Sequence, residues 1–261
     1  MPSFYYLPLK IDDKYIIIEG DEFNHIAKSL RNSIGDIISI TNGQGIKATA
    51  QIEKIESNRL VARIQEKNIF ERSIPRIALA HSVLKNKRTE IIIEKCTELG
   101  VHQFFPFISE RTVKKNYSQQ LVKRWQKIAI SSMKQCDSAF LPHIENIKNF
   151  YEQIKSIASV YQLIIAWEEE KQSFLYNAFP DLNKKKDICL IVGPEGGFTK
   201  EEIDFVRKLN GKVICLGTNV LRAETAAIVI LANTIFCLHS DLQLIKRKFI
   251  TKSTNLSRSN I

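Results

Sequence analysis

Three glycines in the segment Val192-Gly193-Pro194-Glu195-Gly196-Gly197-Phe198-Thr199 are the strongest sign of chemistry in this chain. The segment follows an apolar run and precedes a helix start, so it predicts a strand-to-helix turn at the carboxyl end of a sheet strand, where α/β proteins bind ligands. Glycines there let backbone amides approach a ligand closely. Their order matches neither the dinucleotide fingerprint nor a Walker loop. A tight turn that needs glycine for its geometry alone is the alternative.

A second turn, Leu216-Gly217-Thr218-Asn219-Val220-Leu221-Arg222-Ala223-Glu224, again leads from an apolar run into a helix. Glu224 complements the positive end of the helix dipole, whereas Arg222 opposes it. Arg222 therefore needs a partner. That partner is Glu224 or another acidic side chain, or else an anionic ligand such as a carboxylate or an RNA phosphate.

The elements that must position these turns alternate between strands and helices from Arg76 onward, which predicts a mostly parallel sheet wrapped by helices. The pattern predicts strands over residues 77–83, 103–108, 163–167, 188–192 and 212–216, and helices over 88–99, 119–135, 199–210 and 223–238. Thr199 and Glu202 form a capping-box pattern at one helix start. The last helix is apolar around most of its circumference, so we expect it to be buried inside the fold and against a partner subunit.

The first part of the chain is β-rich and predicts a small barrel that carries one basic helix. Strands are expected over residues 4–7, 15–18, 36–41, 46–55 and 60–65, and the helix over 21–32. Asn42-Gly43 and Gly45 supply the positive φ angles that a hairpin turn requires. Pro75 disfavours helix at the residue before it, which marks residues 70–75 as the boundary between two domains.

With 261 residues and 44% apolar composition, the chain is long enough for two modest cores and too apolar to be disordered. The start has no secretory pattern, and the longest apolar run, residues 226–238, is too short to span a membrane. We therefore expect a soluble, cytoplasmic protein. Its five cysteines have no paired spacing, so we expect neither a metal site nor disulfides.

The net charge of +10 is concentrated in the middle of the chain, since residues 73–150 hold thirteen Lys and Arg against six Asp and Glu. Such a basic band suits the phosphate backbone of a nucleic acid. The alternative is an ordinary solvated helix face. Residues 241–261 are also basic, polar and expected to form a mobile tail.

Several of these motifs together resemble the family of the SPOUT superfamily that methylates N3 of a uridine in the decoding region of 16S ribosomal RNA. The resemblance covers nearly the whole chain. It rests on His25 with Leu30-Arg31, Gly35-Asp36, Lys95 with Thr97-Glu98-Leu99-Gly100-Val101, Pro106, Ser109-Glu110-Arg111, Arg124-Trp125, Gln135, Pro142, Gly193-Pro194-Glu195-Gly196-Gly197, Leu216-Gly217, Val220-Leu221-Arg222 and Glu224-Thr225. One departure is Cys136-Asp137-Ser138-Ala139, where family members often have glycine and arginine.

The resemblance implies an α/β fold with two domains and a homodimer. A PUA-like RNA-binding barrel spans residues 1–72, and a SPOUT methyltransferase domain spans residues 73–240, with a deep trefoil knot within about 160–240. It also implies that S-adenosylmethionine is the cofactor and that 16S rRNA in the small ribosomal subunit is the partner. The residues implied for cofactor binding are Trp167, Gly193, Gly196, Gly197, Leu216, Gly217, Leu221 and Arg222.

Arg222 and Glu195 are the candidates for catalysis, Arg222 by stabilising a uridine anion or its phosphate and Glu195 by orienting the base. Six basic residues are expected to hold RNA: Arg31, Lys85, Arg88, Lys95, Arg111 and Arg124. For each of these six, a surface ion pair is the competing interpretation. For the whole protein, the alternatives are a catalytically silent RNA-binding assembly factor and a SPOUT enzyme that acts on another RNA.

Overall fold

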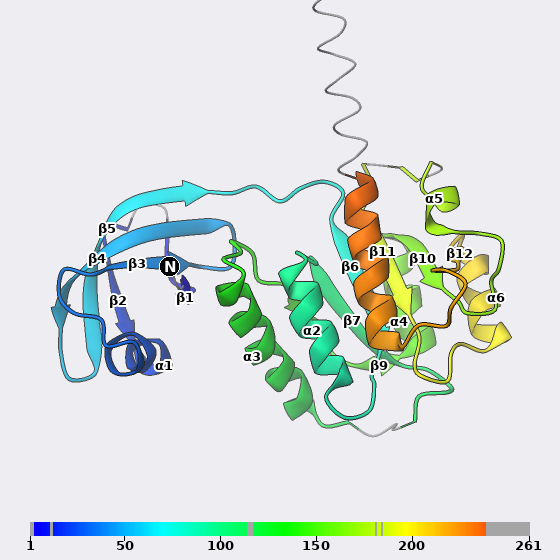
Figure 1. Ribbon diagram of the computed structural model, residues 1–261, viewed down its shortest axis with the longest axis horizontal. Helices are drawn as coiled ribbons and strands as arrows, with labels where there is room; N and C mark the ends of the chain where they lie inside the picture. The colour runs from blue at the N-terminus through cyan, green and yellow to red at the C-terminus, as the bar shows by residue number, and fades with distance from the viewer. Residues whose placement is uncertain (1–2, 11–12, 114–116, 181, 184, 239–261) are drawn as a thin grey trace, which may run out of the picture.

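The chain forms two β-sheets, each with its own core, joined by an extended connection (Figure 1). The computed structural model describes residues 3–10, 13–113, 117–180, 182–183 and 185–238. The expected tail over residues 241–261 lies outside the described residues. None of the helices described is both long and apolar enough to cross a bilayer.

The N-terminal sheet has five strands in the order β1-β3-β4-β5-β2. They are β1 (Ser3–Tyr5), β2 (Tyr15–Glu19), β3 (Ile37–Thr41), β4 (Ile46–Ile55) and β5 (Arg59–Ile69). Asn42 Oδ1 accepts hydrogen bonds from the amides of Gln44 and Ile46, at 2.8 and 3.1 Å, and closes the turn between β3 and β4. Gly43 and Gly45 have φ angles of 68° and 103°, which confirms the expected hairpin.

The helical segment of the N-terminal part is shorter than expected, and the predicted helix over residues 21–32 was wrong in its C-terminal end. It consists of α1 (Gly20–Phe23) and a π-helical turn, η1 (Asn24–Ser29). Leu30 donates from its amide to His25 O at 3.0 Å, the i to i−5 spacing of a π-helix. Helical geometry ends because Arg31 adopts a φ of 55°.

The second sheet is parallel throughout, in the order β12-β10-β11-β6-β7-β8, with β9 also paired to β7. Its strands are β6 (Ile77–Ser82), β7 (Gln103–Ile108), β8 (His143–Ile144), β9 (Lys148–Asn149), β10 (Gln162–Ala166), β11 (Ile188–Val192) and β12 (Lys212–Ile214). Every residue of β6 and β11 is buried, as expected for central strands covered on both faces.

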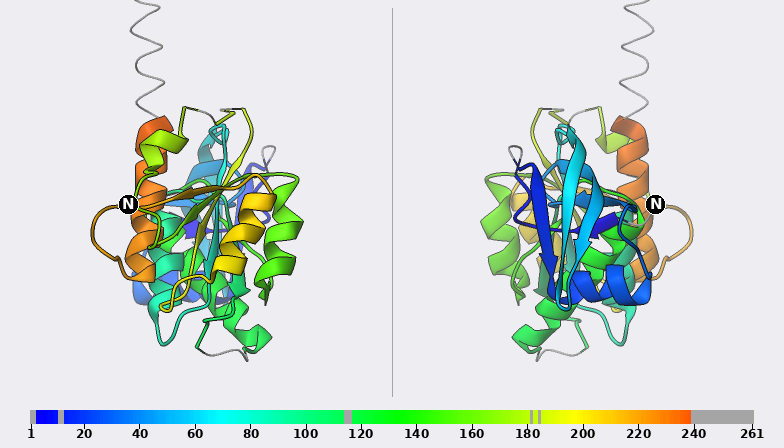
Figure 2. Two further views of the ribbon diagram at one scale, coloured as in Figure 1. Left: turned by 90° about the vertical axis from the view of Figure 1, so that its right-hand side faces the viewer. Right: turned by 90° about the vertical axis from the view of Figure 1, so that its left-hand side faces the viewer.

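Helices cover both faces of this sheet (Figures 1 and 2). One face packs against α2 (Arg88–Glu98), α3 (Gln119–Gln135) and the helix over residues 223–238, and the other against α4 (Phe150–Ala158) and α6 (Lys200–Lys208). A short helix, α5 (Leu175–Ala178), precedes β11. The alternating pattern is therefore confirmed, whereas α4, α5 and the short strands β8 and β9 were not expected.

The end of α3 attaches the second sheet to the N-terminal one. Gly45 donates from its amide to Ala139 O at 2.9 Å, and Leu141 donates to Gly43 O at 2.8 Å. The side chain of Lys134 forms an ion pair of 2.7 Å with Glu22. The departure from the family pattern at residues 136–139 lies in this junction, and Ser138 uses its hydroxyl locally, accepting from the amide of Phe140 at 3.1 Å.

Candidate active site

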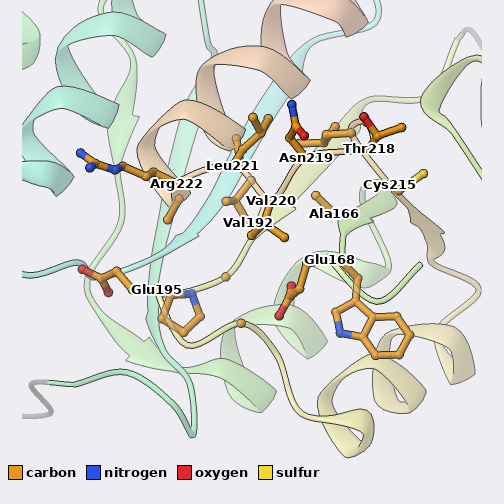
Figure 3. Close-up of a pocket in the computed structure, with 18 of the residues that line it drawn as sticks. Ala166, Glu168, Val192, Glu195, Cys215, Thr218, Asn219, Val220, Leu221 and Arg222 are labelled. Atoms are coloured by element: carbon orange, nitrogen blue, oxygen red, sulfur yellow. The ribbon is translucent and has the colours of Figure 1, made fainter. Parts of the chain in front are cut away.

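A pocket of about 300 Å³ lies where β10, β11 and β12 end (Figure 3). Because the three strands are parallel and adjacent, their carboxyl ends meet at one edge of the sheet. Its lining comes from three turns and the start of the last helix: Ala166, Trp167, Glu168, Lys171, Val192, Gly193, Pro194, Glu195, Gly197, Cys215, Leu216, Gly217, Thr218, Asn219, Val220, Leu221, Arg222, Ala223 and Ala226, with Arg88 from α2. Both turns singled out in the sequence thus meet here.

The glycine turn at 193–197 is shaped by protein contacts as well as by the pocket. A Cβ atom on Gly193 would lie 2.9 Å from the Phe198 ring, and one on Gly196 would lie 3.1 Å from Arg111 Cβ. Gly197 has a φ of 70°, and a Cβ there would overlap the Glu168 carboxylate. At all three positions, contacts within the protein therefore favour a residue without a Cβ atom, whether or not a ligand is bound. Gly193 and Gly197 also line the pocket, whereas Gly196 does not.

The loop after β7 supports the glycine turn from behind. The carboxylate of Glu202, which is fully buried, accepts hydrogen bonds from the amide of Thr199 at 3.0 Å and from the amide of Glu110 at 2.9 Å. Thr199 Oγ1 accepts from the amide of Glu202 at 3.3 Å, which confirms the expected capping box. Arg111 donates from Nη1 to Gly196 O at 3.0 Å. Arg111 thus braces the turn.

Arg222 lies exposed at the pocket mouth, at the start of the last helix (Figure 3). Among the described residues, no carboxylate forms an ion pair with its guanidinium. Glu224, the nearby acidic candidate, instead lies 3.9 Å from Arg88 Nε. A cation without a protein partner at the rim of a pocket is suited to an anionic ligand or to a reacting group that becomes negative.

The carboxylate of Glu195 is already engaged. Its Oε1 accepts from the backbone amide of Lys85 and from Arg88 Nη1, each at 3.3 Å. Burial raises the pKa of Tyr117, and the negative charge of Glu195 raises it further. These contacts tie Glu195 to the start of α2 and place Arg88 inside the pocket lining.

Trp167 lines the pocket directly after β10, and its indole Nε1 is buried with no hydrogen-bond acceptor among the described residues. The Arg207 guanidinium lies over the ring, 5.7 Å from its centre. A buried indole N–H normally has an acceptor, so this atom marks a place where a polar ligand group fits.

Three of the six residues expected to hold RNA have intramolecular partners outside the pocket. Lys95 pairs with Glu94 at 2.7 Å and with Glu98 at 3.0 Å, and Arg124 pairs with Glu90 at 2.8 Å. Arg111 supports the glycine turn. Arg31 and Lys85 are exposed, and the structure describes no acidic partner for either side chain.

Sequence reasoning passed over Lys171, Thr218 and Asn219, which also line the pocket. The signal was present, because all three are polar residues placed within a few positions of a strand end. Glu168, the residue after Trp167, also lines the pocket, and the sequence assigned it no role.

Two family models match this chain. Residues 71–235 match the RNA methyltransferase domain and residues 18–65 match the RNA methyltransferase PUA domain. The first match spans more than half of the sequence, and the chain belongs to this RNA methyltransferase family.

Among its relatives are proteins named ribosomal RNA small subunit methyltransferase E. That of Bacillus subtilis is 28% identical over 223 residues, covering 82% of this chain and 87% of the relative. That of Mesomycoplasma hyopneumoniae is 34% identical over 194 residues, covering 70% and 74%. The crystal structure of the Neisseria gonorrhoeae enzyme of this name, bound to S-adenosyl methionine, has a TM-score of 0.79 and 26% identity, and the match covers 89% of this chain and 96% of that one.

Proposed function

We propose that this chain transfers a methyl group from S-adenosylmethionine to N3 of a uridine in the decoding region of 16S rRNA, in the small ribosomal subunit. The observation that carries the proposal is the pocket between the glycine turn and the turn that ends at Arg222. Family membership supports RNA methylation, and the names of the relatives support the small-subunit RNA as substrate. The choice of N3 and of the decoding region rests on the sequence resemblance.

The pocket fits S-adenosylmethionine in size and in chemistry. A volume of about 300 Å³ is at the lower end of small-molecule sites. We assign cofactor contacts to Trp167, Gly193, Gly197, Leu216, Gly217, Leu221 and Arg222, with Gly196 contributing through the shape of the turn. The unpaired Trp167 N–H offers a donor to a polar group of the cofactor. When bound, the cofactor supplies an activated methyl group.

The residues of the chain must then align the base and stabilise its charge, because N3 of uracil carries a proton that is lost at or before transfer. Arg222 is the stronger candidate for stabilising the resulting anion or the uridine phosphate, since its guanidinium has no described partner. Glu195 orients the base less directly, because Arg88 and the amide of Lys85 hold one of its oxygens. Arg88 lines the same pocket as Arg222 and Glu195.

RNA is held, in this proposal, by the basic band and by Arg31. The partners described for Lys95, Arg111 and Arg124 make these three weaker candidates than Arg31 and Lys85. The exposed lysines of α3, Lys123 and Lys127, extend the same surface.

The finer features of the fold belong to the same proposal. We assign residues 1–72 and 73–240 to the two domains, consistent with a connection that runs from the end of β5 to the start of β6. The trefoil knot is expected within residues 160–240, where β12 pairs with β10 rather than with β11. A cytoplasmic location follows from a substrate in the ribosome.

A homodimer is expected through the helix over residues 223–238. The Phe236 side chain is 72% exposed on this helix, a large apolar group presented to solvent by a single chain. A Phe236→Asp change is expected to shift the protein toward monomer in sedimentation equilibrium. An unchanged dimer would place the interface elsewhere.

The direct test is methyl incorporation into 30S subunits that lack the modification, followed by mass spectrometry of the nucleosides. We expect 3-methyluridine from the native chain. Arg222→Lys keeps the charge but loses the planar fork, so single-turnover methylation should fall at least tenfold and far more than the affinity for the cofactor. A chain that binds S-adenosylmethionine and 30S subunits but never methylates them would be a silent assembly factor.

A further inference from the structure

Glu168 places an unpaired carboxylate inside the pocket. The residue follows β10 by two positions, is half-buried, and reaches toward the turn that carries Glu195 (Figure 3). Its Cδ atom lies 2.7 Å from where a Cβ atom on Gly197 would stand, so the carboxylate packs directly on the glycine turn. Among the described residues, no hydrogen-bond donor or cation contacts this carboxylate.

Glu168 is the carboxylate of the pocket lining that remains available to a ligand, because the other one is already engaged by protein groups. Glu195 is engaged by Arg88 and by a backbone amide. Lys171 lies near Glu168 in sequence, but its Nζ donates to the backbone carbonyl of Glu168, at 2.6 Å, and forms no ion pair with the carboxylate. A half-buried carboxylate loses hydration, and a cationic ligand compensates for that loss.

The proposed reaction changes the charge of the cofactor at one atom. N3 of uridine releases its proton to water, the S–CH₃ bond of the sulfonium breaks with its electron pair staying on sulfur, and the methyl carbon forms a bond to N3. The positive sulfonium becomes a neutral thioether, S-adenosylhomocysteine, while the adenosine, the α-ammonium and the carboxylate are unchanged. A group that senses this centre therefore distinguishes cofactor from product.

We propose that Glu168 is this group: its carboxylate attracts the sulfonium charge, favouring binding of S-adenosylmethionine over S-adenosylhomocysteine and release of the spent product. The inference rests on the proposed function. Gly197 contributes by leaving room for the carboxylate. The interaction is electrostatic, so it requires the charge of Glu168 and not merely its hydrogen-bonding capacity.

The test compares the native chain with Glu168→Gln, which keeps the size of the side chain and removes its charge. Isothermal titration calorimetry would measure S-adenosylmethionine, S-adenosylhomocysteine and sinefungin, whose amine carries a positive charge near the position of the sulfonium. We expect Glu168→Gln to weaken the two cationic ligands about tenfold and S-adenosylhomocysteine less than about twofold, because a charge pair in a half-exposed site contributes modestly. Glu169→Gln, the exposed neighbour outside the pocket, is the matched control.

Each other result overturns the inference. If all three ligands weaken equally, Glu168 holds a part that cofactor and product share, such as the ribose or the α-ammonium. If none weakens, Glu168 does not contact the ligand. Failure of the native chain to bind S-adenosylmethionine would instead refute the proposed function. Thermal unfolding would verify that Glu168→Gln is folded, and Glu168→Ala provides a second variant with the same expected selectivity.

Discussion

The buried carboxylate of Glu202 gives the sharpest test of how the pocket is held in shape. It is the common acceptor for Thr199, at the end of the glycine turn, and for Glu110, in the loop after β7. Replacing Glu202 by alanine removes both bonds and leaves two backbone N–H groups without an acceptor. No other acceptor for either amide is found in the part of the chain that the structure describes.

The expected cost follows from those two donors. A buried N–H group that loses its acceptor costs about 1–3 kcal/mol. Glu110 lies in a part-buried position, so water compensates some of its loss. We therefore expect Glu202→Ala to lower the free energy of unfolding by about 3 kcal/mol, a large fraction of the roughly 5–15 kcal/mol of a typical domain.

Urea unfolding followed by tryptophan fluorescence measures this cost, because Trp125 and Trp167 both lie in the second sheet's part of the fold. With a slope of about 3 kcal/mol per molar urea, the midpoint should fall by about 1 M. Asp204→Ala, which removes only an exposed ion pair with Arg207 on the same helix, should change stability by less than about 0.5 kcal/mol. A loss under about 1 kcal/mol in Glu202→Ala, or equal losses in both variants, would show that Glu202 is not the link between the loops.

Two further predictions concern RNA binding and acid stability. The double change Lys123→Ala and Lys127→Ala should reduce the slope of log affinity for 30S subunits against log salt concentration by about 1.5, since each phosphate contact contributes about 0.7–0.9. The control, Lys155→Ala with Lys208→Ala on the opposite face of the sheet, should leave that slope unchanged. Equal effects of the two double changes would refute a localised RNA-binding surface. His81 is fully buried, and burial lowers its pKa from 6.5 to about 4, so the folded state favours the neutral imidazole. The unfolded chain takes up a proton at this residue below pH 6.5, whereas the folded chain does so only near pH 4. The free energy of unfolding is therefore unaffected by His81 above pH 6.5 and decreases as the pH falls from 6.5 toward 4. Between pH 7.5 and 5 the free energy of unfolding should drop by about 2 kcal/mol through this residue, and urea titrations should find that drop missing in His81→Phe.

Local signals in the sequence were sufficient to predict most of the elements, whereas the sharing of one ligand by the two turns was predicted only through the family resemblance. The bounds of β4, β7, β11 and α3 agree with the expected ranges, because each is a strong apolar pattern with clear ends. Helix α4 was passed over although its signal was present. Phe150, Ile154 and Ile157 are spaced for one buried helix face, and Asn149 caps the start by accepting from the amide of Tyr151 at 2.9 Å.

What could not be predicted depends on contacts between distant parts of the chain. Arg124 looked like an RNA ligand, but it pairs with Glu90, which the packing of α2 against α3 brings beside it. Arg111 likewise binds a carbonyl 85 positions away. The π-helical turn arises where Arg31 ends the helix, and no short sequence rule predicts that geometry. The charge pattern therefore predicted a basic region, but it did not predict which of its residues are free to bind RNA and which form contacts within the protein.

The junction between the two sheets has a consequence for the RNA that the proposed function requires. Backbone bonds from the hairpin at residues 43–45 to residues 139–141, with the Lys134–Glu22 ion pair, join α3 to the N-terminal sheet at a set distance from the pocket. If the proposed function is right, an RNA that contacts the N-terminal sheet and the pocket at the same time has to match the spacing that this junction sets.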